Sequence, residues 1–420
     1  MTGVAVLLLD AAGPESGAII RAAASRGHRV YAAAAPAEFA AYSGELKALL
    51  TGRVLTDFTR PAQAVEEIAA HARRHGIGAV LTVNEYLTEL AALVCAELGL
   101  PGNDPARVHA ARNKAAMAQA LAAAGVRTPH TRLIRDDREL QATLDEVGLP
   151  CVIKPVAGAG SCGVTVAASP AAAAAAAEAA RTAGRPYGGE DGAHILVQAY
   201  APGTEYSVES VTQAGTTTHL AVTRKLVTGG ARRVETGHSL PAHLPAPVEA
   251  AVHREVHAAI HAVGIHDGAS HTEVIVDATG ECTVIEIAAR LAAGQIGILI
   301  QHALGIDIWA ALLDVALGRP AALTPTTHRH ATVRFLTSPY AGRLQSFSGL
   351  PTQGPGVPFV RWRAPLGSQV LQPGANAHRL GSFVVTGEGA AEVEERAVAL
   401  LQQVRIHVDP HTSNPVRPAR

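Results

Sequence analysis

Lysine is scarce in this 420-residue chain, and one of the few lysines precedes a glycine-rich stretch. The 35 basic residues include only four lysines, Lys47, Lys114, Lys154 and Lys225, and the rest are arginine. Arginine serves most surface roles equally well, whereas a compact ammonium group suits a place where a phosphate must be met in a tight space. Lys154 follows an apolar run that begins at residue 151, so it predicts a phosphate contact at the end of a strand.

The glycine-rich stretch 157–164 follows this lysine directly and contains Gly158, Gly160, Ser161 and Gly163. Backbone N–H groups that no side chain shields can surround phosphate oxygens while the lysine supplies charge. The spacing matches neither GxxxxGK[ST] nor GxGxxG, and glycine-rich loops are often simple turns. The stretch therefore predicts a phosphate-binding loop only together with the motifs that follow.

A second motif, 198–208, has the pattern of a strand end, a Pro-Gly turn and a new strand. Gln198 ends the first strand and Glu205 begins the second. A carboxylate in this place can accept hydrogen bonds from two ribose hydroxyls. The alternative is a surface glutamate beside a turn.

Two β-rich runs around the turn 277–280 predict a hairpin that carries Glu273 and Glu286. We expect residue 276 to pair with 281, so that Glu273 faces residue 284 and Glu286 lies two residues further on the same face. Positions in this diagonal relation are about 7–8 Å apart. Two carboxylates at that spacing can converge on Mg²⁺, which takes its other ligands from phosphate and water. Two solvated glutamates are the alternative, which the apolar neighbours of Glu286 disfavour.

Three further residues have types and places that fit chemistry. Arg290 lies four residues past the second glutamate of the hairpin, close enough to approach the same phosphates or a developing oxyanion. Glu85 follows an apolar strand and begins a helix, where open-sheet enzymes place ligand contacts, and its carboxylate can pair with an α-ammonium group. His238 follows an expected turn at 235–237 and could accept a proton or orient a substrate, with a satisfied loop histidine as the alternative.

Strands and helices alternate over the first quarter of the chain. Short apolar runs at 4–9, 29–33 and 79–82 predict strands, and helical patterns end near residue 25 and cover 61–75 and 85–98. This βαβ alternation predicts a small domain with a parallel sheet over residues 1–106.

The rest of the chain has an α+β pattern. Helices are expected at 106–124, 138–147 and 170–183, the last almost pure alanine after a Ser-Pro start. Strands are expected at 151–155, 195–198, 206–212, 218–222, 272–276 and 283–287. From residue 331 onward, short strands with Gly and Pro turns precede a helix at 390–403 and a frayed tail at 411–420.

Composition indicates a compact protein that works on small molecules. Hydrophobic residues make up 48% of the chain and charged residues 17%, and the formal net charge is -1. Nucleic acid and membrane surfaces both need a clustered basic excess, so neither is an expected partner. The four cysteines lack metal or disulfide spacing, and the chain opens on an apolar strand rather than a signal peptide, so a cytoplasmic location is expected.

Taken in order along the chain, these motifs together with Lys114 resemble the ATP-grasp superfamily. Within it, the chain is most similar to the L-amino-acid ligase, or dipeptide synthase, group. The segments that carry this likeness are 235–241 (Glu-Thr-Gly-His-Ser-Leu-Pro), 271–273 (His-Thr-Glu) and 286–294 (Glu-Ile-Ala-Ala-Arg-Leu-Ala-Ala-Gly). The resemblance covers about residues 4 to 315.

The resemblance implies an ATP-grasp fold of α/β and α+β class. Residues 1–106 would form the N-terminal parallel-sheet domain, 107–190 a small lid subdomain, and 191–420 a large subdomain with a β-rich extension. The family uses ATP and Mg²⁺, converts a carboxylate to an acyl phosphate, and lets an amine attack that intermediate. A small-molecule carboxylate and amine are therefore the expected partners, and a homodimer is compatible with this reading.

The resemblance also implies roles for individual residues. Nucleotide contacts fall on the two lysines and the loop (Lys114, Lys154, Gly158, Gly160, Ser161, Gly163), on Gln198, Ala199 and Ala201 for adenine, and on Glu205 for ribose. Glu273 and Glu286 would bind Mg²⁺, and Arg290 would stabilise the acyl phosphate. Glu85, Glu235 and His238 match positions that contact the amino-acid substrate. Two departures stand out: many relatives have an acidic residue in place of Gln198, and D-alanine ligases and biotin carboxylases have a metal-binding asparagine in place of Ala288.

Two other functions remain open. An ATP-grasp enzyme of purine-biosynthesis or carboxylase type would use formate or bicarbonate, and the acid that stimulates ADP release would identify it. A nucleotide-binding module without turnover would bind ATP and release no ADP. The intact Glu273, Glu286 and Arg290 count against the module, because a mere binder can lose such residues freely.

Overall fold

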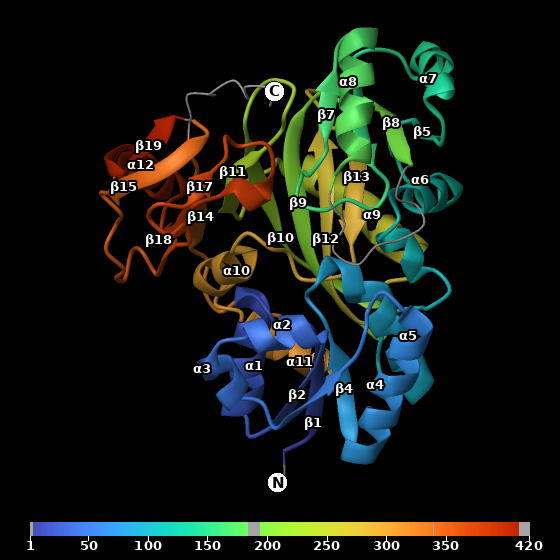
Figure 1. The fold of residues 1–420 in the computed structure, drawn as a ribbon, viewed down its shortest axis with the longest axis vertical. Helices are drawn as coiled ribbons and strands as arrows, with labels where there is room; N and C mark the ends of the chain where they lie inside the picture. Colours follow the sequence, from blue (N-terminus) through green and yellow to red (C-terminus); the bar gives the residue numbers. More distant parts are fainter. Residues whose placement is uncertain (1–2, 184–193, 339, 411–420) are drawn as a thin grey trace, which may run out of the picture.

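The computed structural model describes residues 3–183, 194–338 and 340–410 (Figure 1). The predicted tail at 411–420 and the predicted subdomain boundary at residue 190 lie outside these ranges. The described part forms three bodies around a common centre, with the N-terminal domain at the bottom of Figure 1, the small sheet at the upper right and the C-terminal strands at the left.

The N-terminal domain has the predicted parallel sheet, with strand order β3-β2-β1-β4. Alternate residues of β1 enter two different cores: Val6 and Leu8 pack toward α1, while Leu7 and Leu9 pack toward α4 and α5. Burial on both faces explains why β1 is continuously apolar. The elements are β1 Ala5–Leu9, β2 Arg29–Ala34, β3 Gly52–Leu55, β4 Ile77–Leu81, α1 Pro14–Ser25, α2 Pro36–Ala41, α3 Gly44–Ala48, α4 Pro61–His75 and α5 Thr88–Leu98.

The small subdomain is an antiparallel sheet of order β5-β8-β6-β7 covered by α7 and α8. The alanine-rich α8 begins with Pro170, and the Ser169 side chain accepts a hydrogen bond from the backbone N–H of Ala172. Alanines spaced three or four residues apart face the sheet, which explains how so plain a sequence packs. The elements are β5 Thr131–Ile134, β6 Cys151–Pro155, β7 Thr165–Ala167, β8 Ile195–Ala199, α7 Leu140–Val147 and α8 Pro170–Arg181.

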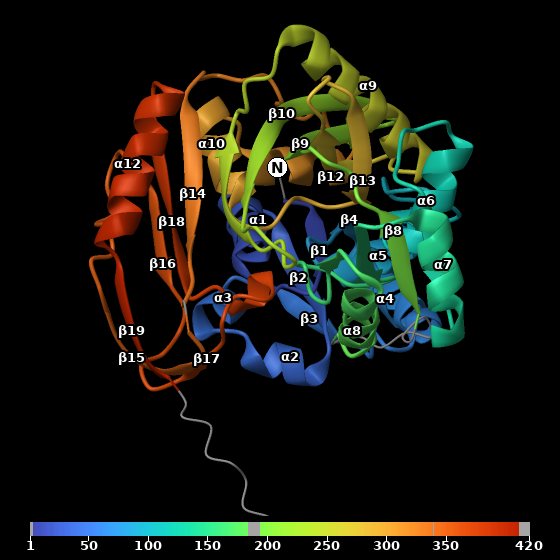
Figure 2. The ribbon, with the colours of Figure 1, turned by 90° about the horizontal axis from the view of Figure 1, so that it is seen from above.

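The large subdomain is built on an eight-stranded sheet of order β13-β12-β9-β10-β11-β14-β18-β16. Its last three strands come from the C-terminal region, so that region continues the central sheet (Figure 2). The strands are β9 Thr204–Gln213, β10 Thr216–Val227, β11 Glu235–Leu240, β12 Gly268–Val276, β13 Cys282–Ala288, β14 His330–Leu336, β16 Phe359–Trp362 and β18 Gly381–Gly387. A separate sheet of order β17-β15-β19 contains β15 Gly342–Ser348, β17 Gln369–Val370 and β19 Arg405–Pro410.

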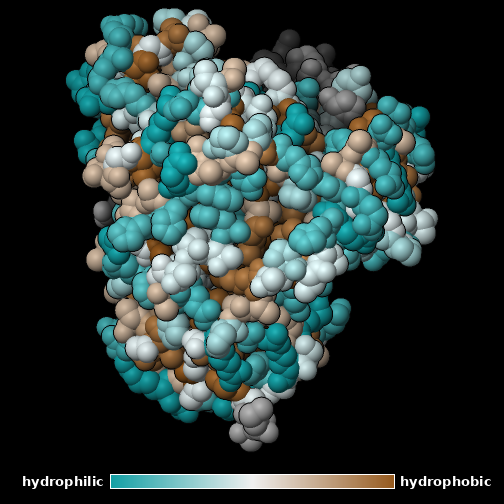
Figure 3. Space-filling view, turned by 180° about the vertical axis from the view of Figure 1, so that it is seen from behind, coloured by the Kyte–Doolittle hydropathy of each residue, from teal (hydrophilic) through white to brown (hydrophobic). Residues whose placement is uncertain are grey.

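Four helices complete the large subdomain. α9 (Ala246–Ala262) packs on β10, β12 and β13, and α12 (Ala390–Gln403) packs on β14 and β18. α10 (Ile296–Leu304) and α11 (Ile308–Ala316) join the large sheet to the N-terminal domain in one apolar core. Within the described ranges no single helix is long and apolar enough to cross a membrane, and α10 and α11 reach that composition only as a pair bent by 106°. Seen from behind, the surface is largely polar, with apolar side chains gathered in a recess near its middle (Figure 3).

Two predicted elements differ from the structure. The helix expected over 106–124 is broken: a 3-10 helix Val108–Ala111 ends before Asn113, and α6 spans Lys114–Ala123. The Asn113 side chain accepts hydrogen bonds from the backbone N–H groups of Ala115 and Ala116, so it caps a new helix. The turn expected at 235–237 is instead the start of strand β11, which pairs with β10 and β14.

Candidate active site

A cavity of about 480 Å³ lies where the three bodies meet. Its walls are the carboxyl end of β4, the glycine-rich loop, the end of β8, one face of the large sheet and two residues of the C-terminal region. Of the residues predicted as a site, all but one line this cavity. The exception is Gly163, where an added Cβ would lie 3.0 Å from the Cβ of Ala183 and 3.2 Å from the Cα of Ala180, so this glycine packs against α8 and its neighbouring residues instead.

The period of two along the central strands produces the polar face of the cavity. On β12, His271, Glu273 and Ile275 line the cavity, whereas Val274 and Val276 pack in the core with α9. Successive side chains of a strand point to opposite faces. One apolar set therefore anchors the sheet while the other set is free to carry charge.

The glycine-rich loop has the backbone conformation that a tight phosphate cradle needs. Gly160 and Ser161 both have left-handed φ angles, +63° and +59°. At Gly158 a Cβ would lie 2.6 Å from the Cγ of Pro155, so only glycine fits there. The carbonyl oxygen of Gly158 accepts a hydrogen bond of 2.7 Å from Lys114 Nζ. The loop is thus held against one of the two predicted phosphate-binding lysines.

Lys114 is the first residue of α6, and the helix break at Asn113 directs it into the cavity. Its side chain is only 7% exposed, and Nζ lies 2.8 Å from Oε1 of Glu286. Lys154, at the end of β6, donates a hydrogen bond of 3.0 Å to Oε1 of Gln198. Burial lowers the pKa of Lys154 to about 8. The amide oxygen of Gln198, which was expected to accept a hydrogen bond from adenine, therefore already accepts one from Lys154. Its second lone pair can accept another hydrogen bond.

The hairpin brings Glu273 and Glu286 closer together than predicted. Glu273 pairs directly with Glu286, and Val276 pairs with Cys282, so the register expected from the sequence is wrong. The causes are a register shift after Glu273 and a wide turn closed by Asp277, whose backbone N–H donates to the carbonyl oxygen of Glu281. Directly opposed Cβ atoms lie about 4.5–5.5 Å apart.

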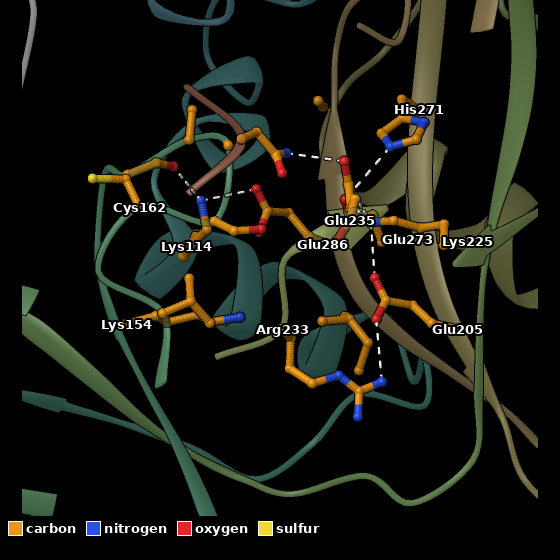
Figure 4. A pocket seen from close by; sticks show the side chains of 18 of the residues that line it. Lys114, Lys154, Cys162, Glu205, Lys225, Arg233, Glu235, His271, Glu273 and Glu286 are labelled. Atoms are coloured by element: carbon orange, nitrogen blue, oxygen red, sulfur yellow. Dashed lines mark hydrogen bonds and ion pairs between the residues drawn. The ribbon is translucent and has the colours of Figure 1, made fainter. Parts of the chain in front are cut away.

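Lys225 lies at the centre of the carboxylates (Figure 4). Its Nζ is 2.8 Å from Glu205, 2.9 Å from Glu235 and 2.6 Å from Glu273. Burial alone would lower the pKa of Lys225, but these three charges outweigh burial and raise it well above its usual value. In turn, although burial opposes it, Lys225 keeps the pKa of Glu235 and of Glu273 below the usual range. One buried cation thus holds the predicted ribose, substrate and metal residues together.

The two hairpin glutamates fit a magnesium ion that is shared with a substrate. Each uses its Oε1 for a lysine, and within the described residues no group of three or more acidic, histidine or cysteine side chains could hold an ion. Mg²⁺ is commonly bound through one or two carboxylates plus substrate phosphates rather than by a cage of protein ligands. Two opposed carboxylates such as Glu273 and Glu286 fit the protein's share of such a coordination.

Arg290 and Glu85 form a buried pair from two bodies of the protein. Arg290 Nε lies 2.5 Å from Oε2 of Glu85, and the two side chains are 15% and 10% exposed. Burial would raise the pKa of Glu85, but the charges of Arg290 and Lys114 lower it instead. Glu85 is therefore ionised. Its ion pair with Arg290 connects the N-terminal domain to the large subdomain.

His271 lies between Glu273 and the buried carboxylate of Glu209. Its Nδ1 lies 2.9 Å from Oε2 of Glu209, and its Nε2 lies 3.5 Å from Oε1 of Glu273. Burial opposes a charge here, yet Glu209 raises the pKa of His271 to about 9. The charged ring of His271 thus lies between Glu209 and Glu273, and it fixes the position of Glu273.

Several charged or polar cavity residues were not predicted as site residues, among them Lys225, Arg233, His271, Asn376 and Arg379. The scarcity of lysine was a signal for Lys225, and the 271–273 motif contains His271. Asn376 and Arg379 lie in the C-terminal region, where the sequence contains no motif. Their sequence neighbours give no sign that the 3-10 helix Asn376–His378 and Arg379 lie against Glu235 at the start of β11.

Comparison with known families agrees with this geometry. Residues 147–298 match the ATP-grasp domain, and residues 20–102 match the ATP-grasp N-terminal domain. Residues 334–409 match the L-amino acid ligase C-terminal domain 2. The N-terminal match lies in the parallel-sheet domain, the ATP-grasp match spans the small sheet and much of the large subdomain, and the third match covers the C-terminal strands.

Individual proteins show the same likeness. The alanine–anticapsin ligase of Bacillus subtilis is 28% identical over 288 residues, which is 64% of this chain and 60% of that ligase. The L-amino acid ligase of Bacillus licheniformis has a similar fold, with a TM-score of 0.81 at 22% identity, covering 97% of this chain and 100% of that one. A phosphoribosylglycinamide synthetase of Anaerococcus prevotii follows at a TM-score of 0.74 and 16% identity, covering 97% and 100%. The predicted fold and resemblance are confirmed: the chain contains an ATP-grasp domain over residues 147–298, preceded by an ATP-grasp N-terminal domain, and it is similar to the L-amino-acid ligases.

Proposed function

We propose that this protein is an ATP-dependent carboxylate–amine ligase that activates the carboxylate of an amino acid and joins it to an amine. One observation carries the proposal: two lysines, a glycine-rich loop, a pair of opposed glutamates and Arg290 line a single cavity. These are the groups needed to hold a nucleoside triphosphate beside a carboxylate. The matches to the ligase C-terminal domain and to the alanine–anticapsin ligase favour this chemistry.

In the first step, a carboxylate oxygen of the substrate attacks the γ-phosphorus of ATP, the bond to the bridging oxygen breaks, and ADP leaves. Lys114 and Lys154 neutralise the phosphate oxygens, and the backbone N–H groups of the glycine-rich loop surround them. Bound Mg²⁺, held by Glu273 and Glu286, would supply further positive charge at the phosphates. Arg290 contacts the carboxylate and then the acyl phosphate, and its pairing with Glu85 fixes its orientation.

In the second step, the amine nitrogen attacks the carbonyl carbon, and the bond from that carbon to the phosphate oxygen breaks. The attacking nitrogen must first lose a proton. The proton passes to solvent, since His238, which lines the cavity, has its pKa lowered by burial to about 4; its neutral ring nitrogen can accept a hydrogen bond from the uncharged amine and so orient it. The nitrogen loses a second proton as phosphate departs. The overall products are an amide, ADP, phosphate and one proton.

The purine-biosynthesis or carboxylase type is the second candidate, because its members share the fold. That likeness concerns the fold alone, as the phosphoribosylglycinamide synthetase is only 16% identical. Ala288 lines the cavity and offers no metal ligand, where carboxylases would place an asparagine according to the family resemblance. The C-terminal match to L-amino acid ligases also favours the amino-acid reading.

The deciding experiment is an ADP-release screen over pairs of amino acids and amines, with mass spectrometry of the products. A substrate carboxylate labelled with ¹⁸O should transfer one label to the released phosphate, because its oxygen attacks phosphorus. ADP release with formate or bicarbonate but with no amino acid would identify the second candidate. ATP binding with no ADP release for any acid would mean a nucleotide-binding module.

A further inference from the structure

Four residues meet at the end of the cavity that the C-terminal region closes. We call Glu235, His238, Asn376 and Arg379 the Glu235 cluster; all four line the cavity. Oε2 of Glu235 accepts hydrogen bonds from Asn376 Nδ2 at 2.9 Å and from Arg379 NH2 at 2.6 Å. Its Oε1 lies 2.9 Å from Lys225 Nζ. Both oxygens of Glu235 are therefore occupied by the protein, and a ligand must be met by the surrounding side chains.

Three polar atoms of the cluster are buried and have no hydrogen-bond partner within the described residues: His238 Nδ1, Asn376 Oδ1 and Arg379 Nε. The side chains of His238 and Arg379 are only 3% and 10% exposed. Leaving a buried polar group unpaired is unfavourable, so several such groups in one place indicate a missing partner. The amide of Asn376 has a fixed orientation, because Nδ2 must donate to the carboxylate.

The chemistry of the three atoms describes the partner. Arg379 offers an N–H donor on a permanent positive charge, which a carboxylate complements. Asn376 offers a carbonyl oxygen, which an amine N–H complements, and His238 offers an uncharged ring nitrogen beside it. We propose that the Glu235 cluster binds the amine substrate, with Arg379 contacting a carboxylate of that substrate and with Asn376 and His238 contacting its amino group. The inference rests on the ligase function proposed above.

Phe335 holds the two halves of the cluster in a fixed relation. The guanidinium of Arg379 lies 3.5 Å from the centre of the Phe335 ring, and the His238 ring meets the same ring nearly edge-on at 5.3 Å and 81°. One apolar ring on β14 thus positions both the arginine expected to contact the carboxylate and the histidine expected to contact the amino group. A substrate held in this way carries a carboxylate beside its amine, so the product would keep that carboxylate free.

The experiment compares an amino acid, its amide and hydroxylamine as amine substrates, with ATP and the carboxylate substrate held constant. Arg379→Gln should raise the KM for the amino acid about 10- to 100-fold, the scale of a hydrogen bond to a charge. The KM for the amide, which lacks the carboxylate, should stay the same. Hydroxamate formation from hydroxylamine should also be unchanged, since it reports only on activation of the first substrate. Arg361→Gln is the matched control, an exposed arginine of β16 outside the cavity.

The outcomes distinguish a failure of this inference from a failure of the proposed ligase function. An unchanged KM for the amino acid in Arg379→Gln, or equal losses for the amino acid and its amide, would overturn the inference while hydroxamate formation still supported the ligase. No hydroxamate from the wild-type protein with any carboxylate would instead remove the proposed function. If Arg379→Gln fails to fold, Arg379→Lys keeps the charge beside Glu235 but lacks the Nε donor. That variant should fold and still lose the preference for the amino acid over its amide.

Discussion

Lys225 Nζ lies 2.6 Å from Oε1 of Glu273, and the same nitrogen also contacts Glu205 and Glu235. The lysine side chain is 2% exposed, so solvent hardly screens its attraction to these three carboxylates. Removing one partner of a buried ion pair leaves an uncompensated charge.

Lys225→Met should therefore destabilise the fold by about 3–5 kcal/mol at neutral pH. Urea denaturation followed by circular dichroism measures the change. The deficit should shrink as the pH is lowered toward about 4.3, the usual pKa of a glutamate, because the orphaned carboxylates then take up protons. The control is Lys47→Met, since Lys47 is partly exposed and has no carboxylate partner within the described residues; its Nζ donates to the carbonyl oxygen of Ala40 and lies 5.4 Å from the centre of the Phe39 ring. Equal stability of the two variants would contradict the central role of Lys225.

Lys154 predicts a pH dependence of ATP binding. Burial lowers its pKa to about 8 in the free protein, whereas nearby phosphates favour the charged form. Above pH 8 the free protein must take up a proton to bind ATP, so affinity should fall with rising pH, approaching about tenfold per pH unit. Calorimetric titration with ATP between about pH 7 and about pH 9.5 measures this slope.

Lys154→Arg is the control for that slope, because arginine stays charged over the whole range. Its ATP affinity should vary little with pH, whatever its absolute value. A flat profile for the wild-type protein would mean that Lys154 does not meet the phosphates.

The sequence alone predicted much of the fold, and its failures have physical causes. The helices α4 and α12 have the predicted bounds, because each is a single amphipathic run with clear ends. The helix over 106–124 was too long, since the cap at Asn113 interrupts a region that is helix-forming on both sides. The strand β11 was missed because its segment, Glu-Thr-Gly-His-Ser-Leu, has no apolar alternation; its neighbours β10 and β14 stabilise it.

The prediction of the site also succeeded within sequence motifs and failed where tertiary structure decides. Residues within motifs, such as Glu273 and Glu286, were predicted to converge, but the register of their hairpin depends on a bulge that periodicity cannot show. Asn376 and Arg379 are more than 130 residues away from Glu235 in the chain (|i−j| = 141 and 144). Only the strand order of the large sheet, which places the C-terminal strands beside β11, brings them to the cavity.

Glu286 should matter more for turnover than for ATP binding. Glu286→Gln keeps the shape of the side chain but removes a metal-binding charge and the partner of Lys114. We expect turnover to fall at least about 100-fold, because charge develops at phosphorus in the transition state, while ATP affinity changes far less. ADP release and calorimetric ATP binding measure the two quantities.

Glu281→Gln is the matched control for this variant, because Glu281 lies at the tip of the same hairpin with its side chain 59% exposed. It should keep wild-type turnover. The metal role would be refuted by full activity of the wild-type protein in the presence of a chelator.

The carboxylate substrate should depend on Glu85 and the nucleotide should not. Glu85 begins the 3-10 helix Glu85–Leu87, where the Asn84 side chain accepts from the backbone N–H of Tyr86, so its backbone is fixed without its own side chain. Glu85→Ala should raise the KM for the amino acid that is activated by an amount worth about 1.5–3 kcal/mol, the usual scale for a hydrogen bond to a charge, with ATP affinity unaffected. Turnover should fall as well, because Arg290 loses the carboxylate that orients it. Initial-rate kinetics at varied amino acid and varied ATP concentrations separate these effects. Glu89→Ala is the control, because Glu89 lies one turn further along the chain and pairs with His109 at 3.1 Å. Equal losses of affinity for ATP and for the amino acid would show that Glu85 serves the fold, through its contact between the N-terminal domain and Arg290, rather than the substrate.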